Sequence, residues 1–164
     1  MTVPLPMLRE SSLHDVRRAF AAAPEPELAV LIGIHAGKAL GPLWLRGPAP
    51  ALMALTGMAG WYGKSLRSDG SDVLVGENLV RRGDSIEPSI PITATLAPSR
   101  VDGRAAIVVS YPPDARFPWR RVKDELRPLD GNTLLGLTFG IPAMPADGVP
   151  FVLRRTSEEE GQAS

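Results

Sequence analysis

The feature that most constrains this fold is an alternation of residue character with period two near the end of the chain. Residues 121–127 and 133–139 both alternate, and the turn sequence Asp130-Gly131-Asn132 separates them. One face of the first segment carries Val122, Asp124 and Leu126, and the other carries Arg121, Lys123, Glu125 and Arg127. In the second segment, Leu135, Leu137 and Phe139 share a face opposite Leu134, Gly136 and Thr138. This pattern predicts a β-hairpin with two different faces.

The rest of the chain predicts more short strands and few helices. Further strands are expected at 28–35, 61–64, 73–82, 92–96, 104–111 and 151–155. A helix is expected to begin at Ser12, which Asp15 matches as a capping pair, and to end before Pro24, and a shorter helix is expected near 50–55. Many short strands joined by Gly and Pro turns indicate a barrel or a sandwich. We favour a mainly β protein, a small antiparallel β-barrel (calycin/lipocalin-like), with an N-terminal helix beside or across one end.

The expected domain organisation is simple. Residues 1–10 are predicted to be a flexible arm, 11–155 a single β-barrel domain, and 156–164 a disordered acidic tail that contains Glu158–Glu160. Residues 1–10 lack the basic and apolar regions of a signal peptide. No apolar run reaches the roughly 18 residues of a membrane helix. We therefore expect a cytoplasmic protein with no membrane partner.

Composition excludes several classes of function. Eighteen Lys and Arg balance eighteen Asp and Glu, and this zero net charge argues against a nucleic-acid or anionic-membrane partner. There is no cysteine, and His14 and His35 are the two histidines, so we expect no metal centre and no cofactor. The chain also lacks G-x-S-x-G, Walker and G-x-G-x-x-G motifs. Outside the acidic tail the charge is slightly positive and rich in Arg.

Two short motifs carry more specific information. The first is Gly33-Ile34-His35-Ala36-Gly37, and the second is Gly60-Trp61-Tyr62-Gly63-Lys64. With the strand LLGLTF at 134–139 and the closing PFVLRR at 150–155, the chain resembles the GXWXG proteins from about Val16 to Arg155. In that family a short N-terminal domain is usually followed by a second domain of unknown function. The resemblance implies an architecture and no agreed activity, and His35 stands where the family motif has Trp.

His35 has two interpretations. It ends an apolar run and lies between two glycines that allow close approach of a backbone or a ligand. The structural interpretation is an interior histidine bonded to a carboxylate or a carbonyl group. The functional interpretation is a proton-transfer or ligand-anchoring residue, because a pKa near 6.5 suits both roles.

The other candidates lie on two predicted strands. By simple alternation Trp61 faces one side of its strand, and Tyr62 and Lys64 face the other. Trp61 is then a core aromatic or closes the barrel floor, and Lys64 is a surface charge or pairs with an acidic ligand at a pocket mouth. Arg121 and Glu125 lie either on a solvated face or in the interior, where guanidinium groups recognise anions. Residues 112–119 form either a structural loop or a lid.

Three hypotheses for function follow. The leading one is a barrel that binds a small, mostly apolar molecule, oriented through a carboxylate or enolate group. Its expected ligand contacts are His35, Trp61, Tyr62, Lys64, Arg121 and Glu125. The second is a cyclase or isomerase for a hydrophobic polyketide- or terpenoid-like substrate, with His35 as catalytic proton-transfer group and Tyr62 or Glu125 as its partner. The third is a homodimer formed through an exposed sheet edge without a ligand.

Overall fold

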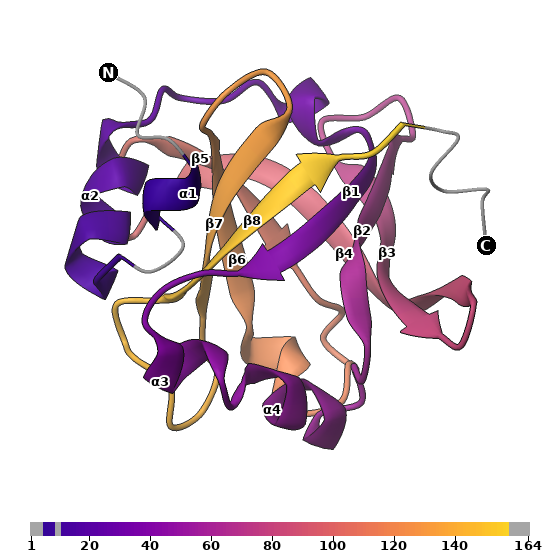
Figure 1. Cartoon of the computed structure of the whole chain (residues 1–164). Helices are drawn as coiled ribbons and strands as arrows, with labels where there is room; N and C mark the ends of the chain where they lie inside the picture. The colour runs from indigo at the N-terminus through magenta and orange to yellow at the C-terminus, as the bar shows by residue number, and fades with distance from the viewer. Residues whose placement is uncertain (1–4, 9–10, 158–164) are drawn as a thin grey trace.

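Eight antiparallel strands follow one another around a closed barrel, in which β1 pairs with both β2 and β8 (Figure 1). The computed structural model describes residues 5–8 and 11–157. The strands are β1 (Gly33–Ala39), β2 (Trp61–Ser68), β3 (Leu74–Arg82), β4 (Ser85–Pro98), β5 (Ala105–Ser110), β6 (Lys123–Pro128), β7 (Thr133–Phe139) and β8 (Val149–Arg155). The predicted antiparallel β-barrel is confirmed, and the sandwich alternative is excluded.

Short helices surround the barrel. They are α1 (Leu5–Leu8), α2 (Leu13–Ala22), α3 (Leu43–Arg46), α4 (Ala49–Leu55) and the 3₁₀ turns η1 (Leu28–Leu31) and η2 (Trp119–Arg121). Among the described residues, none of these helices has the length and apolarity needed to cross a membrane. In Figure 1, α3 and α4 lie across the lower end of the barrel, opposite the turn that joins β6 to β7.

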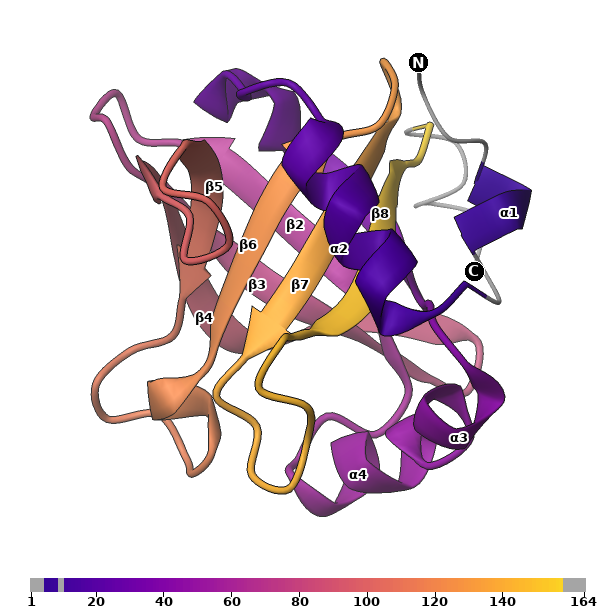
Figure 2. The same cartoon turned by 90° about the vertical axis from the view of Figure 1, so that its left-hand side faces the viewer.

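Helix α2 begins as the sequence predicts and packs on the side of the barrel. The Ser12 hydroxyl accepts a bond from the Asp15 backbone N–H at 3.1 Å, which caps the helix. Figure 2 shows α2 lying over β7. Val16, Ala19 and Phe20 are buried against outward-facing residues of the barrel, including Leu135 and Val152. Short apolar residues in the N-terminal stretch join this layer as well, since Leu8 in α1 is buried there. Of the arm predicted at 1–10, residues 5–8 are described and form α1, and the rest lies outside the described residues, as does Glu158–Glu160 of the predicted tail.

The sequence predicts one strand at 28–35, and this prediction is wrong. The segment forms a 3₁₀ turn followed by the start of β1. Leu28–Leu31 forms η1, and the chain then turns at Gly33, whose φ of 112° suits glycine. The turn directs Leu31 into the barrel, where it is fully buried against residues of the inner cluster. A short apolar run can form either a buried strand or a turn that fills the end of a barrel, and the sequence pattern does not distinguish them. Here Leu31 is buried at the end of the barrel, so the run forms the turn.

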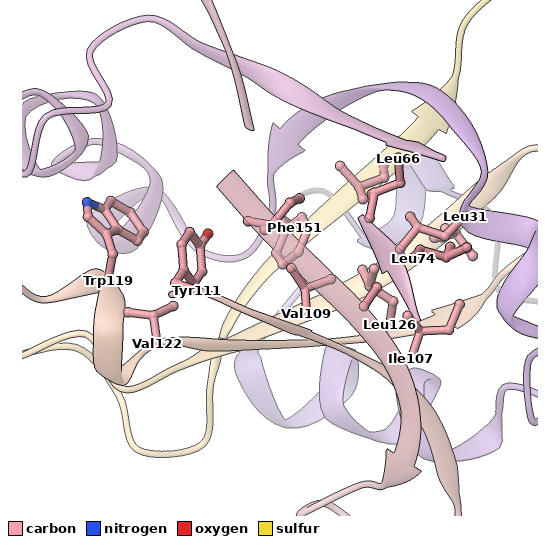
Figure 3. Packing of buried hydrophobic residues seen from close by; sticks show 14 of the residues in the cluster. Leu31, Leu66, Leu74, Ile107, Val109, Tyr111, Trp119, Val122, Leu126 and Phe151 are labelled. Atoms are coloured by element: carbon pink, nitrogen blue, oxygen red, sulfur yellow. The ribbon is translucent and has the colours of Figure 1, made fainter. Parts of the chain in front are cut away.

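The barrel interior is an apolar cluster with two distinct ends. Figure 3 shows Leu31, Leu66, Leu74, Ile107 and Leu126 grouped toward one end, and Tyr111, Val122 and Trp119 toward the other. Val109 and Phe151 lie between the two groups (Figure 3). The packed leucines lie at the end near η1, and the polar side chains of the interior lie toward Tyr111.

Candidate functional site

An apolar pocket enters the barrel at the end covered by α4. Its volume is about 100 Å³. The segment 49–58, which contains α4, covers this end of the barrel and is called the cap below. The pocket walls come from the cap, from the loops at that end and from the barrel interior: Ala39, Ala49, Met53, Met58, Trp61, Trp119, Ile141, Val149, Pro150 and Phe151. Lys64, Tyr111, Asp124 and Thr138 add polar groups to this lining. The pocket is therefore an apolar space with a polar floor.

The floor of the pocket is the buried ion pair of Lys64 and Asp124, and both side chains form additional hydrogen bonds. Lys64 Nζ lies 2.9 Å from Asp124 Oδ2, and both side chains are at most 3% exposed. Lys64 also donates to Asn78 Oδ1 at 2.8 Å, which in turn accepts a bond from Trp61 Nε1 at 3.2 Å. The Thr138 hydroxyl donates to Asp124 Oδ1 at 2.7 Å. A buried charge pair is tolerated when additional hydrogen bonds satisfy both members, as they do here.

The electrostatics keep Lys64 charged and Tyr111 protonated. Burial is the largest single effect and lowers the pKa of Lys64, but Asp124 and Tyr111 together outweigh it, and the net effect raises the pKa. Burial and the nearby Asp124 charge raise the pKa of Tyr111 to about 12. At neutral pH the floor therefore holds an ammonium, a carboxylate and a neutral phenol, whose formal charges cancel.

The Tyr111 hydroxyl is the group at the floor that keeps a hydrogen-bond donor for another molecule. It accepts from Lys64 Nζ at 3.5 Å and from Asn78 Nδ2 at 3.3 Å. Among the described residues, it has no acceptor for its own proton within hydrogen-bond distance. A phenol in this position offers its O–H to an oxygen atom placed in the pocket.

Two glycines make room for the aromatic walls of the pocket. A Cβ on Gly37 would lie 2.2 Å from the indole of Trp61, and one on Gly136 would lie 2.3 Å from the ring of Phe151. The two rings meet edge to face, with centroids 5.9 Å apart. Gly37 is the second glycine of the first sequence motif, so that glycine serves the packing of Trp61.

The cap over the pocket is loosely attached. Helix α4 contains no buried residue, and Leu55 at its end is 79% exposed. The cap is tied to the barrel by the buried Met58 and by the Trp119 indole N–H, which donates to the Thr56 carbonyl at 2.7 Å. The predicted lid or structural loop at 112–119 thus serves to anchor α4.

The second motif does not alternate as predicted. A bulge between Trp61 and Gly63 adds a residue to β2, so that Trp61 and Lys64 both point into the pocket. Tyr62 lies outside, where the Arg81 guanidinium stacks 5.4 Å from its ring centre. Trp61 and Lys64 are thus the predicted contacts that the structure brings together.

The structure places Arg121 and Glu125 away from the pocket. Arg121 is exposed in η2, which begins before the strand that the sequence predicts. Glu125 is buried on the outer face of β6, where it accepts bonds from the Ser99 hydroxyl and the Arg100 backbone N–H. The alternation from 121 to 127 was correct in its two faces, but the charged face is the outer one.

Arg127 on this outer face shows why the charges there are buried. Its guanidinium donates to both Asp102 oxygens, at 2.7 and 2.8 Å, and to the carbonyl groups of Phe20, Arg104 and Ala105. The Arg127 hydrogen bond is the main cause that lowers the pKa of Asp102 to about 2. Arg127 therefore joins α2 to the barrel and is not an anion-binding group.

His35 lies inside the barrel but at the opposite end from Lys64's pocket. It lines a separate cavity, and its Nδ1 is buried without a hydrogen-bond partner. Burial and the neighbouring Arg155 lower its pKa to about 4, against the smaller opposing effect of the Gly33 and Val30 carbonyls. His35 is thus neutral at pH 7 and has no contact with Tyr62 or Glu125, the partners predicted for it.

Sequence reasoning missed Asn78, Tyr111 and Asp124. Each lies within a predicted strand or at its end, so the alternation alone assigned each of them to a face without revealing a polar cluster. The signal that identifies them is a set of polar side chains on otherwise apolar inward faces. In the described part of the chain, no three His, Asp or Glu side chains gather closely enough to hold a metal ion.

Comparisons with known proteins support the fold. No protein-family model matches the chain, and no curated protein matches it. The chain is similar to the crystal structure of a protein from Thermomonospora curvata, with a TM-score of 0.66 and 23% sequence identity over 90% of each chain. At that identity the likeness shows a shared β-barrel fold. The resemblance to the GXWXG proteins stays a prediction.

Proposed function

We propose that this barrel binds a small, mostly apolar molecule in the pocket below α4, with one ligand oxygen at the Tyr111 hydroxyl. The observation that carries the proposal is the unused Tyr111 proton beside the Lys64–Asp124 pair, at the floor of an apolar pocket. Ligand sites typically combine apolar walls with a few placed polar groups. Trp61 and Phe151 supply those walls.

The charge balance favours a neutral carbonyl oxygen over the carboxylate that the sequence predicted. Asp124 already neutralises Lys64, so an anion would enter a buried site without a free counter-charge. A ketone or aldehyde oxygen needs one donor, and Tyr111 provides it. An enolate is accommodated to the extent that Lys64 and Tyr111 share its charge.

The pocket must open to take such a molecule. Its volume of about 100 Å³ is below the several hundred that drug-sized ligands need, and near the roughly 150 Å³ that holds benzene. Met53 and Met58 are flexible side chains at the cap. We infer that α4 moves outward with them when a ligand larger than one ring enters.

A matched pair of probes tests this site. Acetophenone and ethylbenzene share a ring and differ in the carbonyl oxygen, and the methyl signals of Met53 and Met58 report occupancy, with exposed Met7 as reference. We expect acetophenone to bind more tightly, by the roughly 0.5–1.5 kcal/mol of one hydrogen bond. Tyr111→Phe removes this preference, and Tyr62→Phe on the outer face retains it. Equal affinities in the wild-type protein would refute the proposal.

Native mass spectrometry of the purified protein identifies the natural ligand. A co-purifying small molecule with one carbonyl group on a hydrocarbon body is the expected result. The catalytic alternative loses its specific support, because His35 contacts neither Tyr62 nor Glu125. The dimer alternative requires a free strand edge, and among the described strands the longest stretch without a second neighbour is the start of β4.

A further inference from the structure

A second cavity lies at the other end of the barrel, and nothing in the first site uses it. Its volume is about 320 Å³. Its lining comes from η1, from the turn between β6 and β7 and from the ends of β1 and β8, at the top of the barrel in Figure 1. Val30, Pro128, Leu129 and Leu134 provide apolar surface there, and His35 and Arg155 provide polar groups.

His35 lines this cavity and carries a buried polar atom for which residues 5–8 and 11–157 supply no partner. The residue is 1% exposed, and its Nδ1 is buried with no hydrogen-bond partner in the described part of the chain. It is the one buried side-chain nitrogen or oxygen among the described residues without such a partner. Burying a polar atom unpaired costs about 1–3 kcal/mol. The described residues leave this cost uncompensated.

Arg155 brings a positive charge to the same cavity. It is the cross-strand partner of His35 on β8, so both side chains lie on the same face of the sheet. Its Nη2 donates to the Val30 carbonyl at 2.9 Å, and Nη1 lies over Gly33. No carboxylate of the described residues forms an ion pair with it. The remaining guanidinium donors are available to an anion.

We propose that this cavity binds a small monocarboxylate, with its carboxylate held between the His35 imidazole and the Arg155 guanidinium. The hydrocarbon part of the ligand lies against Val30, Pro128 and Leu134. Guanidinium and imidazole N–H groups are both donors that suit a carboxylate. The two sites differ in net charge: the ion pair of Lys64 and Asp124 is neutral, whereas Arg155 makes the second site cationic.

Binding at this site is coupled to a proton. The pKa of His35 is lowered to about 4 in the free protein, by burial and by Arg155. A carboxylate beside the ring raises this pKa, so a proton is taken up on binding and affinity increases as pH falls from 7 toward 5. Asp130 is the other charged group that lines the cavity, and its charge opposes an incoming anion. Lys64, opposite His35 on β2, is already paired with Asp124.

Imidazole nitrogen spectra test the proposal directly, because His14 serves as an internal reference. The His14 side chain is 78% exposed on α2, far from the cavity lining. Benzoate is the probe, and benzamide is its neutral counterpart. We expect benzoate to shift the His35 signals and to raise the His35 pKa, without affecting His14. Benzamide should bind about tenfold more weakly, because it lacks the charge.

Two neighbouring arginines provide a matched pair of variants. Arg154 and Arg155 are both exposed, and alternation places Arg154 on the outer face. Arg155→Gln should weaken benzoate binding about tenfold, and Arg154→Gln should change it by less than about twofold. Benzoate that leaves His35 unshifted, or that binds both variants equally, would overturn the site, and the cavity would then hold water alone.

The carboxylate has a second source in this chain, at Glu158–Glu160. A protein that ends at Ser157 distinguishes the two sources. For a free ligand, we expect the shorter protein to show the same His35 signals and the same benzoate affinity. Altered His35 signals without benzoate, together with tighter benzoate binding, would identify the tail as the occupant and overturn the small-molecule assignment. Acetophenone binding is followed at Met53 and Met58, and benzoate binding is followed at His35. The two proposals are therefore tested independently.

Discussion

At the scale of single residues, the buried ion pair of Lys64 and Asp124 is the most consequential feature. Removing two charges from water costs more than their attraction alone returns, so such a pair is stable only when its hydrogen bonds are complete. Asn78 and Thr138 complete them here. The pair therefore adds polarity and orientation to the pocket rather than net stability.

The effects of replacing Lys64 and Asp124 on stability should not be additive. Asp124→Leu leaves Lys64 unpaired in the interior and should lower the free energy of unfolding by about 3–5 kcal/mol, and Lys64→Met should do so similarly. The double variant should regain most of this loss, because no charge remains unpaired. Urea unfolding measures all three. Glu77→Gln, which breaks the exposed pair with Arg67, should change stability by less than about 1 kcal/mol. Additive losses in the double variant would contradict this account.

His35 should make stability depend on pH in one defined window. Its pKa is about 4 in the folded protein and about 6.5 in the unfolded chain, so the unfolded state binds a proton first as pH falls. Stability is complete above pH 6.5 and decreases by about 3 kcal/mol between pH 6.5 and 4. The His35→Gln variant should lack this decrease, and His14→Gln should retain it. Equal pH profiles for wild type and His35→Gln, from denaturant unfolding at each pH, would disprove the assignment.

At the scale of elements, the cap and the barrel differ in how firmly they are held. Helix α4 contributes no buried residue, whereas most of β7 is buried between α2 and the barrel interior. Segments with little buried apolar surface open locally at a low cost in free energy. The element that our proposal requires to move is also the one with the least buried surface.

Amide hydrogen exchange measures this difference. Peptides that cover residues 49–55 should exchange much faster than peptides that cover 133–139. A ligand in the pocket should slow exchange in α4 through Met53 and leave β7 unchanged. Helix α2, which is capped and buried, provides a helical comparison and should exchange more slowly than α4. Equal protection of α4 and α2 would mean that the cap is rigid.

At the scale of the whole molecule, closure of the barrel removes almost every free strand edge. The longest remaining edge in the described part of the chain is the first half of β4, because residues 85–92 pair with β3 but not with β5. Pro88 and Pro91 lie in this stretch, and proline has no N–H to offer a new strand. Edge prolines of this kind prevent pairing with a second chain.

Replacing Pro88 and Pro91 should create a strand edge that pairs with a second copy of the chain. The variant Pro88→Val/Pro91→Val restores two backbone donors and adds β-branched residues, so we expect it to self-associate as concentration rises. Sedimentation velocity at a series of concentrations follows this. Pro98→Val, in the part of β4 that pairs with β5, should behave as the wild-type protein does. A double variant that remains as dispersed as the wild type would show that another feature protects this edge.

The sequence alone was sufficient for the position of most strands and for the start of α2. Alternation at 121–127 and 133–139, with turns at Asp102-Gly103 and Asp130-Gly131, predicts the antiparallel order because side-chain direction in a strand is a local property. Ser12 likewise begins α2 through a contact within one helical turn. The charge balance and the lack of cysteine also needed no structure.

Only the tertiary structure decided what those faces meet. The bulge in β2 turned Trp61 and Lys64 to the same side, barrel closure brought Asp124 and Tyr111 to Lys64, and α2 covered the face that holds Glu125. His35 lies opposite Lys64 in the β1–β2 register but lines the cavity at the other end of the barrel. Contacts between distant strands depend on register and closure, which are set by packing the whole ring, and no local pattern encodes them.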